Sequence, residues 1–264
     1  MTPPPLFPPG KKLLIGVIHL PPLPGAPRWA GRLETVLQSA RADARAYEAG
    51  GADAVIVENF GDVPFHPGAV GPETVAAMAV AGAAVREVVG LPLGFNVLRN
   101  DVRSALALCA ACGGGFVRVN VHTGAMLTDQ GLLEGRAAET LRYRREIVPG
   151  TEIWADVHVK HAVPLGAEDL GDAARDAGER GLADALIVSG RGTGLTTDRT
   201  SVARMRAACP SARILLGSGV TAANVGDYLE LADGFIVGSS LKRDGCTANP
   251  VDERRVAELV RALR

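Results

Sequence analysis

Apolar and polar positions alternate along the chain in two regular ways. Short runs rich in β-branched residues alternate with longer amphipathic stretches, from one end of the sequence to the other. The short runs predict eight strands, at 13–19, 54–59, 93–97, 116–122, 152–160, 185–190, 213–218 and 234–238. The longer stretches predict helices near 33–50, 72–89, 101–112, 134–147, 168–180, 198–209, 221–231 and 252–263.

This alternation predicts a (β/α)8 TIM barrel, because eight parallel strands with right-handed helical crossovers close into a ring. An open doubly wound sheet is the alternative. It would call for a G-x-G-x-x-G turn after the first strand, where this chain has PPLPGAP (21–27). No linker divides the chain, so we predict one domain over 12–264, preceded by a flexible lead-in over 1–11.

Composition and charge narrow the class of protein. The chain has 264 residues with 28 Lys+Arg against 29 Asp+Glu, a balance that argues against nucleic-acid binding. Its apolar runs are shorter than the roughly 18–20 residues of a membrane span. The proline-rich start lacks a signal-peptide h-region, and four scattered cysteines form no disulfide framework. We therefore expect a cytoplasmic protein that is not embedded in a membrane.

Period-two alternation indicates which side chains enter the barrel. Barrel interiors are normally filled by branched apolar side chains, so inward polar groups call for an explanation. Arg118 lies deeper in its strand and is interpreted as part of a buried network. The other polar side chains predicted to point inward are His19, Glu58, Asn96, Asn120, His122, Asp156, His158 and Lys160.

Asp156 and Lys160 fall in the carboxyl-terminal half of their strand, where TIM-barrel active sites form. A partly desolvated lysine has a lowered pKa and acts as a general base or Schiff-base amine, whereas a neighbouring carboxylate keeps it charged. We predict these two residues to be an acid–base or nucleophilic pair. Further predicted catalytic residues are Glu58, His122 and His19, and predicted substrate-binding residues are Asn96, Asn120, His158, Ser189 and Arg191.

A metal site is the weaker interpretation of the histidines. The first strand has a single His rather than H-x-H, and no predicted helix carries H-E-x-x-H. No cofactor is predicted. A mononuclear divalent-metal site assembled from His19, Glu58, His122 and Asp156 stays open as an alternative.

Small residues end the seventh and eighth predicted strands. They allow backbone N–H groups to approach an anion, and barrels frequently bind phosphate after these two strands. Tight turns that require glycine are the alternative explanation. The predicted phosphate-binding residues are Gly217, Ser218, Gly219, Gly238, Ser239, Ser240 and Lys242. Long loops at 21–31, 60–71 and 123–135 are predicted to be lids, binding elements or an oligomer interface.

Several segments resemble a known family. GVIHLPPLPGAP (16–27), RVNVHTGAMLTDQG (118–131), ADVHVKHAVPL (155–165) and DGFIVGSSLKRDGCTANPVD (233–252) closely resemble the BtpA/SgcQ family, and the resemblance spans nearly the whole chain. It implies a TIM barrel of the ribulose-phosphate-binding type. The family takes its name from a role in photosystem I biogenesis in cyanobacteria, and other members accompany sugar-transport genes.

Ionisable groups directed into a barrel favour an enzyme over a scaffold. We predict an enzyme that acts on a small phosphorylated sugar or phosphoribosyl compound, of the isomerase, epimerase or lyase type. One alternative is a non-catalytic biogenesis or stability factor for a membrane complex such as photosystem I. A metal-assisted hydrolase is another. The expected partners are a small phosphorylated substrate and further copies of the chain in a homo-oligomer, with no nucleic acid.

Overall fold

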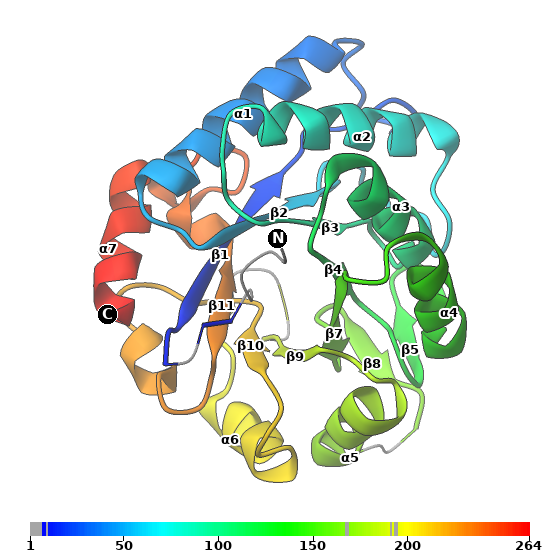
Figure 1. Ribbon diagram of the computed structural model, residues 1–264, viewed down its shortest axis with the longest axis vertical. Helices are drawn as coiled ribbons and strands as arrows, with labels where there is room; N and C mark the ends of the chain where they lie inside the picture. The colour runs from blue at the N-terminus through cyan, green and yellow to red at the C-terminus, as the bar shows by residue number, and fades with distance from the viewer. Residues whose placement is uncertain (1–6, 9, 167–168, 191, 193–194) are drawn as a thin grey trace.

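The residues described form a closed barrel of eight parallel strands surrounded by helices (Figure 1). The computed structural model describes residues 7–8, 10–166, 169–190, 192 and 195–264. The barrel strands are β1 (Leu13–His19), β2 (Ala54–Glu58), β3 (Leu93–Asn96), β4 (Phe116–Val119), β7 (Glu152–Val157), β9 (Ala185–Val188), β10 (Ile214–Leu216) and β11 (Gly234–Val237). Their order around the ring is β1-β11-β10-β9-β7-β4-β3-β2, which confirms the predicted TIM barrel.

The helices lie outside the ring, where they cover the strands. Asp101, Asp169, Asp198 and Asp252 cap four of them by accepting a hydrogen bond from a backbone N–H of the first turn. The α-helices are α1 (Leu33–Ala49), α2 (Pro72–Arg86), α3 (Val102–Cys112), α4 (Ala137–Ile147), α5 (Leu170–Arg175), α6 (Arg199–Ala208) and α7 (Glu253–Leu263). None of the helices described is both long and apolar enough to cross a membrane.

The prediction of a helix at 221–231 is wrong. A single 3₁₀ turn, η2 (Val225–Tyr228), stands in its place between β10 and β11. The side chain of Asn224 accepts a hydrogen bond from the Thr221 N–H at 2.8 Å, so the segment begins as a local turn.

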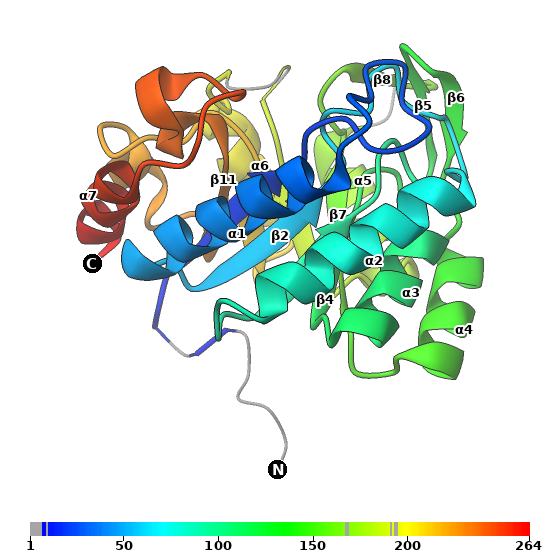
Figure 2. The same ribbon diagram turned by 90° about the horizontal axis from the view of Figure 1, so that it is seen from above.

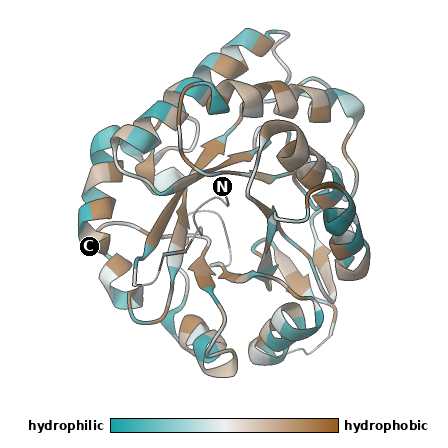
Figure 3. Ribbon diagram, viewed as in Figure 1, coloured by the Kyte–Doolittle hydropathy of each residue, from teal (hydrophilic) through white to brown (hydrophobic). Residues whose placement is uncertain are grey.

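The barrel strands are coloured mostly as hydrophobic in Figure 3. Because their side chains alternate in direction, they form two apolar layers, one inside the barrel and one beneath the helices. The inner layer fills the barrel and includes Ile15, Phe116 and Trp154. The rings of Phe116 and Trp154 stack with their centroids 3.7 Å apart. Phe7, from the predicted lead-in, packs edge-on against Trp154 at 5.6 Å, so this residue contacts the barrel.

A small antiparallel sheet stands at one end of the barrel. Its strands are β5 (Ala125–Thr128), β6 (Gly131–Glu134) and β8 (Ala162–Pro164), in the order β6-β5-β8. The sheet lies at the same end of the barrel as the loop that follows β1 (Figure 2). The segment 123–135 is therefore a hairpin rather than the loop that the sequence predicts.

Candidate functional site

Two adjoining cavities open where the barrel strands end. The β10–β11 cavity, about 330 Å³, is lined by residues 217–221 and 236–240 together with His19 and Arg255. The β3–β4 cavity, about 240 Å³, is lined by the end of β3, by Asn120 and by residues of the 60–65 loop. Glu58, Arg118 and Lys160 line both cavities, so these three side chains stand at the junction. Active sites of TIM barrels form at this end of the barrel.

Lys160 follows the end of β7 and brings an ammonium group to the junction. Burial lowers the pKa of Lys160 from its ordinary value, and Arg118 lowers it further, while Glu58 and Asp156 oppose the shift. Within the described part of the chain, the Lys160 Nζ has no hydrogen-bond or ion-pair partner. A lysine with a lowered pKa and a free amine is suited to act as a base or a nucleophile.

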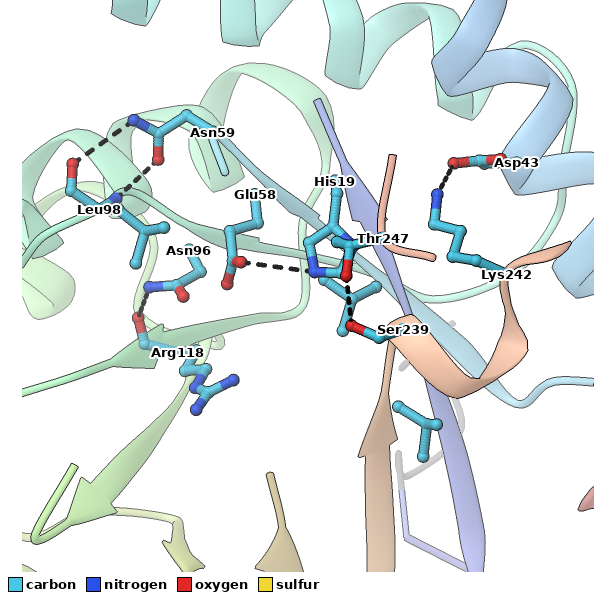
Figure 4. Close-up of polar contacts among 12 residues, drawn as sticks. His19, Asp43, Glu58, Asn59, Asn96, Leu98, Arg118, Ser239, Lys242 and Thr247 are labelled. Atoms are coloured by element: carbon cyan, nitrogen blue, oxygen red, sulfur yellow. Dashed lines mark hydrogen bonds and ion pairs between the residues drawn. The ribbon is translucent and has the colours of Figure 1, made fainter. Parts of the chain in front are cut away.

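Glu58 and His19 face each other from neighbouring strands (Figure 4). The His19 Nε2 lies 3.7 Å from the Glu58 Oε1, and the Glu58 residue is only 5% exposed. Burial holds the pKa of His19 well below its ordinary value, and Lys242, Lys160 and Arg118 add to that effect. His19 is therefore neutral at pH 7, so this contact is a polar one between a neutral imidazole and a carboxyl group.

A buried network below the junction holds Asp156. The Arg118 Nε donates to Asp156 Oδ2 at 2.8 Å and the Arg118 Nη2 to Oδ1 at 2.9 Å. Asn120 donates to Oδ2 at 2.9 Å and Ser189 to Oδ1 at 3.1 Å, so each carboxylate oxygen accepts two hydrogen bonds. The Asp156 side chain is fully buried and lines neither cavity.

The predicted pair of Asp156 with Lys160 is thus replaced by a pair of Asp156 with Arg118. Because Asp156 and Ser189 are engaged in this network, they hold Arg118 in position rather than contact a ligand. Arg118 belongs to the buried network as the sequence indicates, and its guanidinium also lines both cavities. Burial is the largest single effect on Arg118 and lowers its pKa, but Asp156 and Glu58 together outweigh burial, so the pKa of the guanidinium is raised.

Asn96 and Asn120 lie side by side at the ends of β3 and β4. The Asn96 Nδ2 donates to the Arg118 backbone oxygen at 3.2 Å and to the Asn120 Oδ1 at 3.1 Å. Both asparagines line the β3–β4 cavity, as their predicted substrate-binding role requires. Among the described residues the buried Asn96 Oδ1 has no hydrogen-bond partner.

The predicted phosphate-binding glycines and serines all line the β10–β11 cavity, but the glycines are explained by packing. A Cβ on Gly217 would lie 2.7 Å from the Ile187 side chain, and one on Gly238 would lie 2.4 Å from the His19 Cε1. Gly219 has a φ of +68°, which favours glycine. Neighbouring protein atoms therefore require these glycines whether or not a ligand approaches them.

The serine hydroxyls of the same loops form hydrogen bonds within the protein, so the backbone amides are the groups left to bind an anion. Ser239 bonds to Thr247 at 2.7 Å, as Figure 4 shows, and Ser240 donates to the Val220 oxygen at 2.6 Å. The backbone N–H groups of Gly219, Ser239 and Ser240 donate to no protein acceptor that lies within the described residues. Arg255, at the start of α7, lines this cavity and was missed from the sequence because no strand or loop pattern connects it to the barrel mouth.

The structure corrects the prediction that Lys242 contributes to phosphate binding. Its ammonium group forms an ion pair with Asp43 of α1 and points away from the cavity (Figure 4). Both side chains are 2% exposed, so the pair is a buried link between α1 and the 239–251 loop. Lys242 does not line the β10–β11 cavity, and a direct contact with phosphate is therefore not supported.

His122 and His158 also lie outside the two cavities. The His122 Nε2 bonds to the Gly181 oxygen at 2.7 Å, so the ring faces the outer layer. His158 follows the last residue of β7 with a φ of 53°, and it lines a separate cavity of about 20 Å³ against Ala173 and Ala177. Alternation fails for both residues because they lie beyond the ends of their strands. Arg191, another predicted substrate-binding residue, lies outside the described residues.

The metal site considered in the sequence analysis does not assemble. His122 and Asp156 are bonded elsewhere, and no group of three His, Cys, Asp or Glu residues in the described ranges is arranged to hold a metal ion.

A further cavity, about 370 Å³, lies outside the barrel between α3, α4 and the β5–β6 hairpin. Arg103 and Tyr143 line it, with the guanidinium 4.0 Å from the ring centroid. It contains none of the groups at the junction, so we place the site at the barrel mouth.

The fold and the cavities define a (β/α)8 barrel protein with a charged pocket at the carboxyl ends of its strands. A family model described as "BtpA family" matches residues 10–264. The chain is 46% identical over 250 residues to the photosystem I biogenesis protein BtpA of Synechocystis sp., covering 95% of this chain and 87% of the relative. It is 34% identical over 253 residues to the putative sgc region protein SgcQ of Escherichia coli K12, covering 95% and 93%. The chain belongs to the BtpA family.

Solved structures share the barrel at low sequence identity. Tryptophan synthase from Mycobacterium tuberculosis superimposes with a TM-score of 0.62 at 18% identity, covering 96% of this chain and 93% of that one. Phosphoribosyl anthranilate isomerase from Thermus thermophilus superimposes with a TM-score of 0.57 at 14% identity, covering 95% and 98%. These similarities show the fold alone.

Proposed function

We propose that the protein is an enzyme that acts on a small phosphorylated sugar or phosphoribosyl compound, by acid–base chemistry of the isomerase, epimerase or lyase type. The observation that carries the proposal is the junction of the two cavities. A lysine with a lowered pKa stands there beside Glu58, next to a cavity lined by backbone amides, and neither the lysine amine nor these amides have a partner among the described residues.

The β10–β11 cavity supports binding of a phosphate group. Backbone N–H groups that converge on a concavity bind anions, and a guanidinium adds charge-assisted hydrogen bonds. The amides of Gly219, Ser239 and Ser240 supply the first, and Arg255 supplies the second. A phosphate held there places the rest of a small sugar toward Glu58 and Lys160.

The junction supports proton transfer next to a carbonyl group. In an isomerisation, a base removes a proton from the carbon beside the carbonyl, and a proton is delivered to the carbonyl oxygen. Because burial lowers the pKa of Lys160, its amine loses a proton more readily than that of an exposed lysine, which suits it to the first step or to Schiff-base formation in a lyase. Glu58 and the neutral His19 are suited to carry the second proton.

A ligand screen followed by a matched pair of variants tests the proposal. Phosphorylated sugars are first ranked by thermal shift, because a ligand that binds the native state stabilises it. Turnover of the best ligand is then followed by proton NMR in D₂O. We expect Lys160→Met to lower turnover by about 10²–10⁴-fold. Lys11→Met is the control, since Lys11 is paired with Asp53 and lines neither cavity. Full turnover in a folded Lys160→Met variant would contradict the proposal.

A second candidate function, binding of a protein partner, is favoured by one surface. Leu127, Leu132 and Val163 lie directly opposite one another across β6, β5 and β8, and they are 51%, 50% and 58% exposed. Exposed apolar patches mark interaction sites. One relative is named for photosystem I biogenesis. Leu127→Asp should abolish partner capture and leave ligand binding intact if this function holds, and unchanged capture would exclude the surface.

A further inference from the structure

The β3–β4 cavity offers apolar space that binding of a phosphorylated sugar alone does not require. Its outer walls are apolar and are formed by Phe60, Val63, Phe65 and Leu98. A volume of about 240 Å³ corresponds to about eight water molecules at roughly 30 Å³ each, the size of one small ring system. A sugar hydroxyl would gain little from these walls, whereas the face of a flat ring would pack against them.

Two buried polar groups line the same cavity and are not fully satisfied by the protein. The Asn96 residue is 1% exposed, and its Nδ2 is held by two hydrogen bonds, so the side chain is fixed in orientation. Its Oδ1 has no partner in the described part of the chain and is available as an acceptor. Figure 4 shows Asn96 beside Glu58 and Arg118 at the junction.

Arg99 supplies the complementary donor. It is 4% exposed, and its Nη2 donates to the Lys160 backbone oxygen at 2.6 Å. Burial lowers the pKa of Arg99, and the more distant carboxylates of Asp156 and Asp129 only partly oppose that effect, because no carboxylate of the described residues lies within ion-pair distance of its guanidinium. A buried guanidinium without a carboxylate partner favours an acceptor supplied by a ligand. Away from the charged junction groups, Asn96 and Arg99 therefore add an acceptor and a donor to the cavity beside its aromatic walls.

We propose that the β3–β4 cavity binds a flat, nitrogen-containing ring, so that the substrate class is a nucleotide-like ribosyl phosphate. The ring N–H donates to the Asn96 Oδ1, a ring carbonyl accepts from Arg99, and Phe60 and Phe65 contact the ring. The ribose spans the junction beside Lys160, and the phosphate occupies the β10–β11 cavity. This inference rests on the proposed function, because it assumes that the phosphate binds in the β10–β11 cavity.

Isothermal titration of the full chain tests the inference with four probes: inorganic phosphate, ribose 5-phosphate, UMP and IMP. UMP and IMP each carry a ring with an N–H next to a carbonyl group. We expect at least one of them to bind tenfold or more tightly than ribose 5-phosphate. Affinities for both nucleotides within twofold of that for ribose 5-phosphate would overturn the inference and leave the proposed function standing. If ribose 5-phosphate and inorganic phosphate also fail to bind, the proposed function itself fails.

A variant locates the ring. Phe65→Ala should reduce the affinity gain of the nucleotide over ribose 5-phosphate by about tenfold, and leave ribose 5-phosphate affinity within twofold of wild type. Val80→Ala is the control, because Val80 lies on α2, is 46% exposed and lines neither cavity. A nucleotide gain that persists in Phe65→Ala would place the ring elsewhere and overturn the inference.

Discussion

Replacement of Asp156 by Asn separates a positioning role from a catalytic one. The substitution keeps the shape of the side chain and removes its charge. Arg118, which forms two hydrogen bonds to the carboxylate at 2.8 and 2.9 Å, then loses its charge partner inside the barrel. Asn120 and Ser189 also donate to this carboxylate, so the substitution removes or weakens part of their hydrogen bonding.

The magnitude follows from the burial of the pair. The exposed fractions of the two side chains are 3% for Arg118 and 0% for Asp156, so solvent screens neither charge. Breaking a buried pair by removing one partner costs about 3–5 kcal/mol. For a chain of this size each kcal/mol corresponds to about 2–4 °C in melting temperature. We therefore expect Asp156→Asn to melt roughly 6–20 °C below wild type.

The assay is urea unfolding followed by circular dichroism, with thermal melting as a second measurement. The double variant Arg118→Met with Asp156→Leu is the comparison, because apolar replacement of both members of a buried pair is often close to neutral. It should recover most of the stability lost in Asp156→Asn. A loss below about 1 kcal/mol in Asp156→Asn, within the range of an exposed ion pair, would refute the buried network as the reason for this residue.

Three further predictions concern the surroundings of the site. Gly238→Ala should lower the free energy of unfolding in urea by about 1–3 kcal/mol, because the new Cβ would lie 2.4 Å from the His19 Cε1. Gly226→Ala is the control, since a Cβ there would meet open space. Equal stability of the two variants would contradict close packing of His19 against Gly238. Lys242→Met removes the cation that pairs with the buried Asp43 and should lower the free energy of unfolding by about 3–5 kcal/mol. Phosphate affinity measured by titration should stay within twofold of wild type. A large loss of affinity in the folded variant would show that Lys242 does contact the phosphate. Because the pKa of His19 in the folded state lies below its ordinary value of 6.5, the unfolded state binds more protons and stability falls as pH decreases below 6.5, by at most about 1.4 kcal/mol per pH unit for this group. His19→Phe should flatten that part of the pH profile of unfolding, and an unchanged slope would show that His19 does not titrate differently on unfolding.

Strand periodicity predicted the barrel and the inward side chains wherever a strand continues. Arg118 and Asp156 lie within β4 and β7, and both enter the barrel as alternation predicts. His122 and His158 lie past the last strand residues, where the backbone turns and a rule of period two no longer applies. Lys160 also lies past the end of β7, yet it reaches the junction.

Long-range contacts decide the rest of the site. Lys242 and Asp43 are 199 positions apart, and the sequence contains no sign of their pairing. Arg99 and Arg255 reach the cavities from a loop and from the last helix, so strand patterns do not identify them. The β5–β6 hairpin was missed because its turn at Asp129 and Gln130 and its short strands resemble a long loop in composition.

A crystal structure of the protein with ribose 5-phosphate tests the central claim most directly. The phosphate should lie in the β10–β11 cavity, within hydrogen-bond distance of the backbone amides of Gly219, Ser239 and Ser240, with the sugar beside Lys160 and Glu58. A phosphate bound elsewhere on the chain, or an empty β10–β11 cavity at saturating ribose 5-phosphate, would contradict the claim that this end of the barrel is a site for phosphorylated sugars.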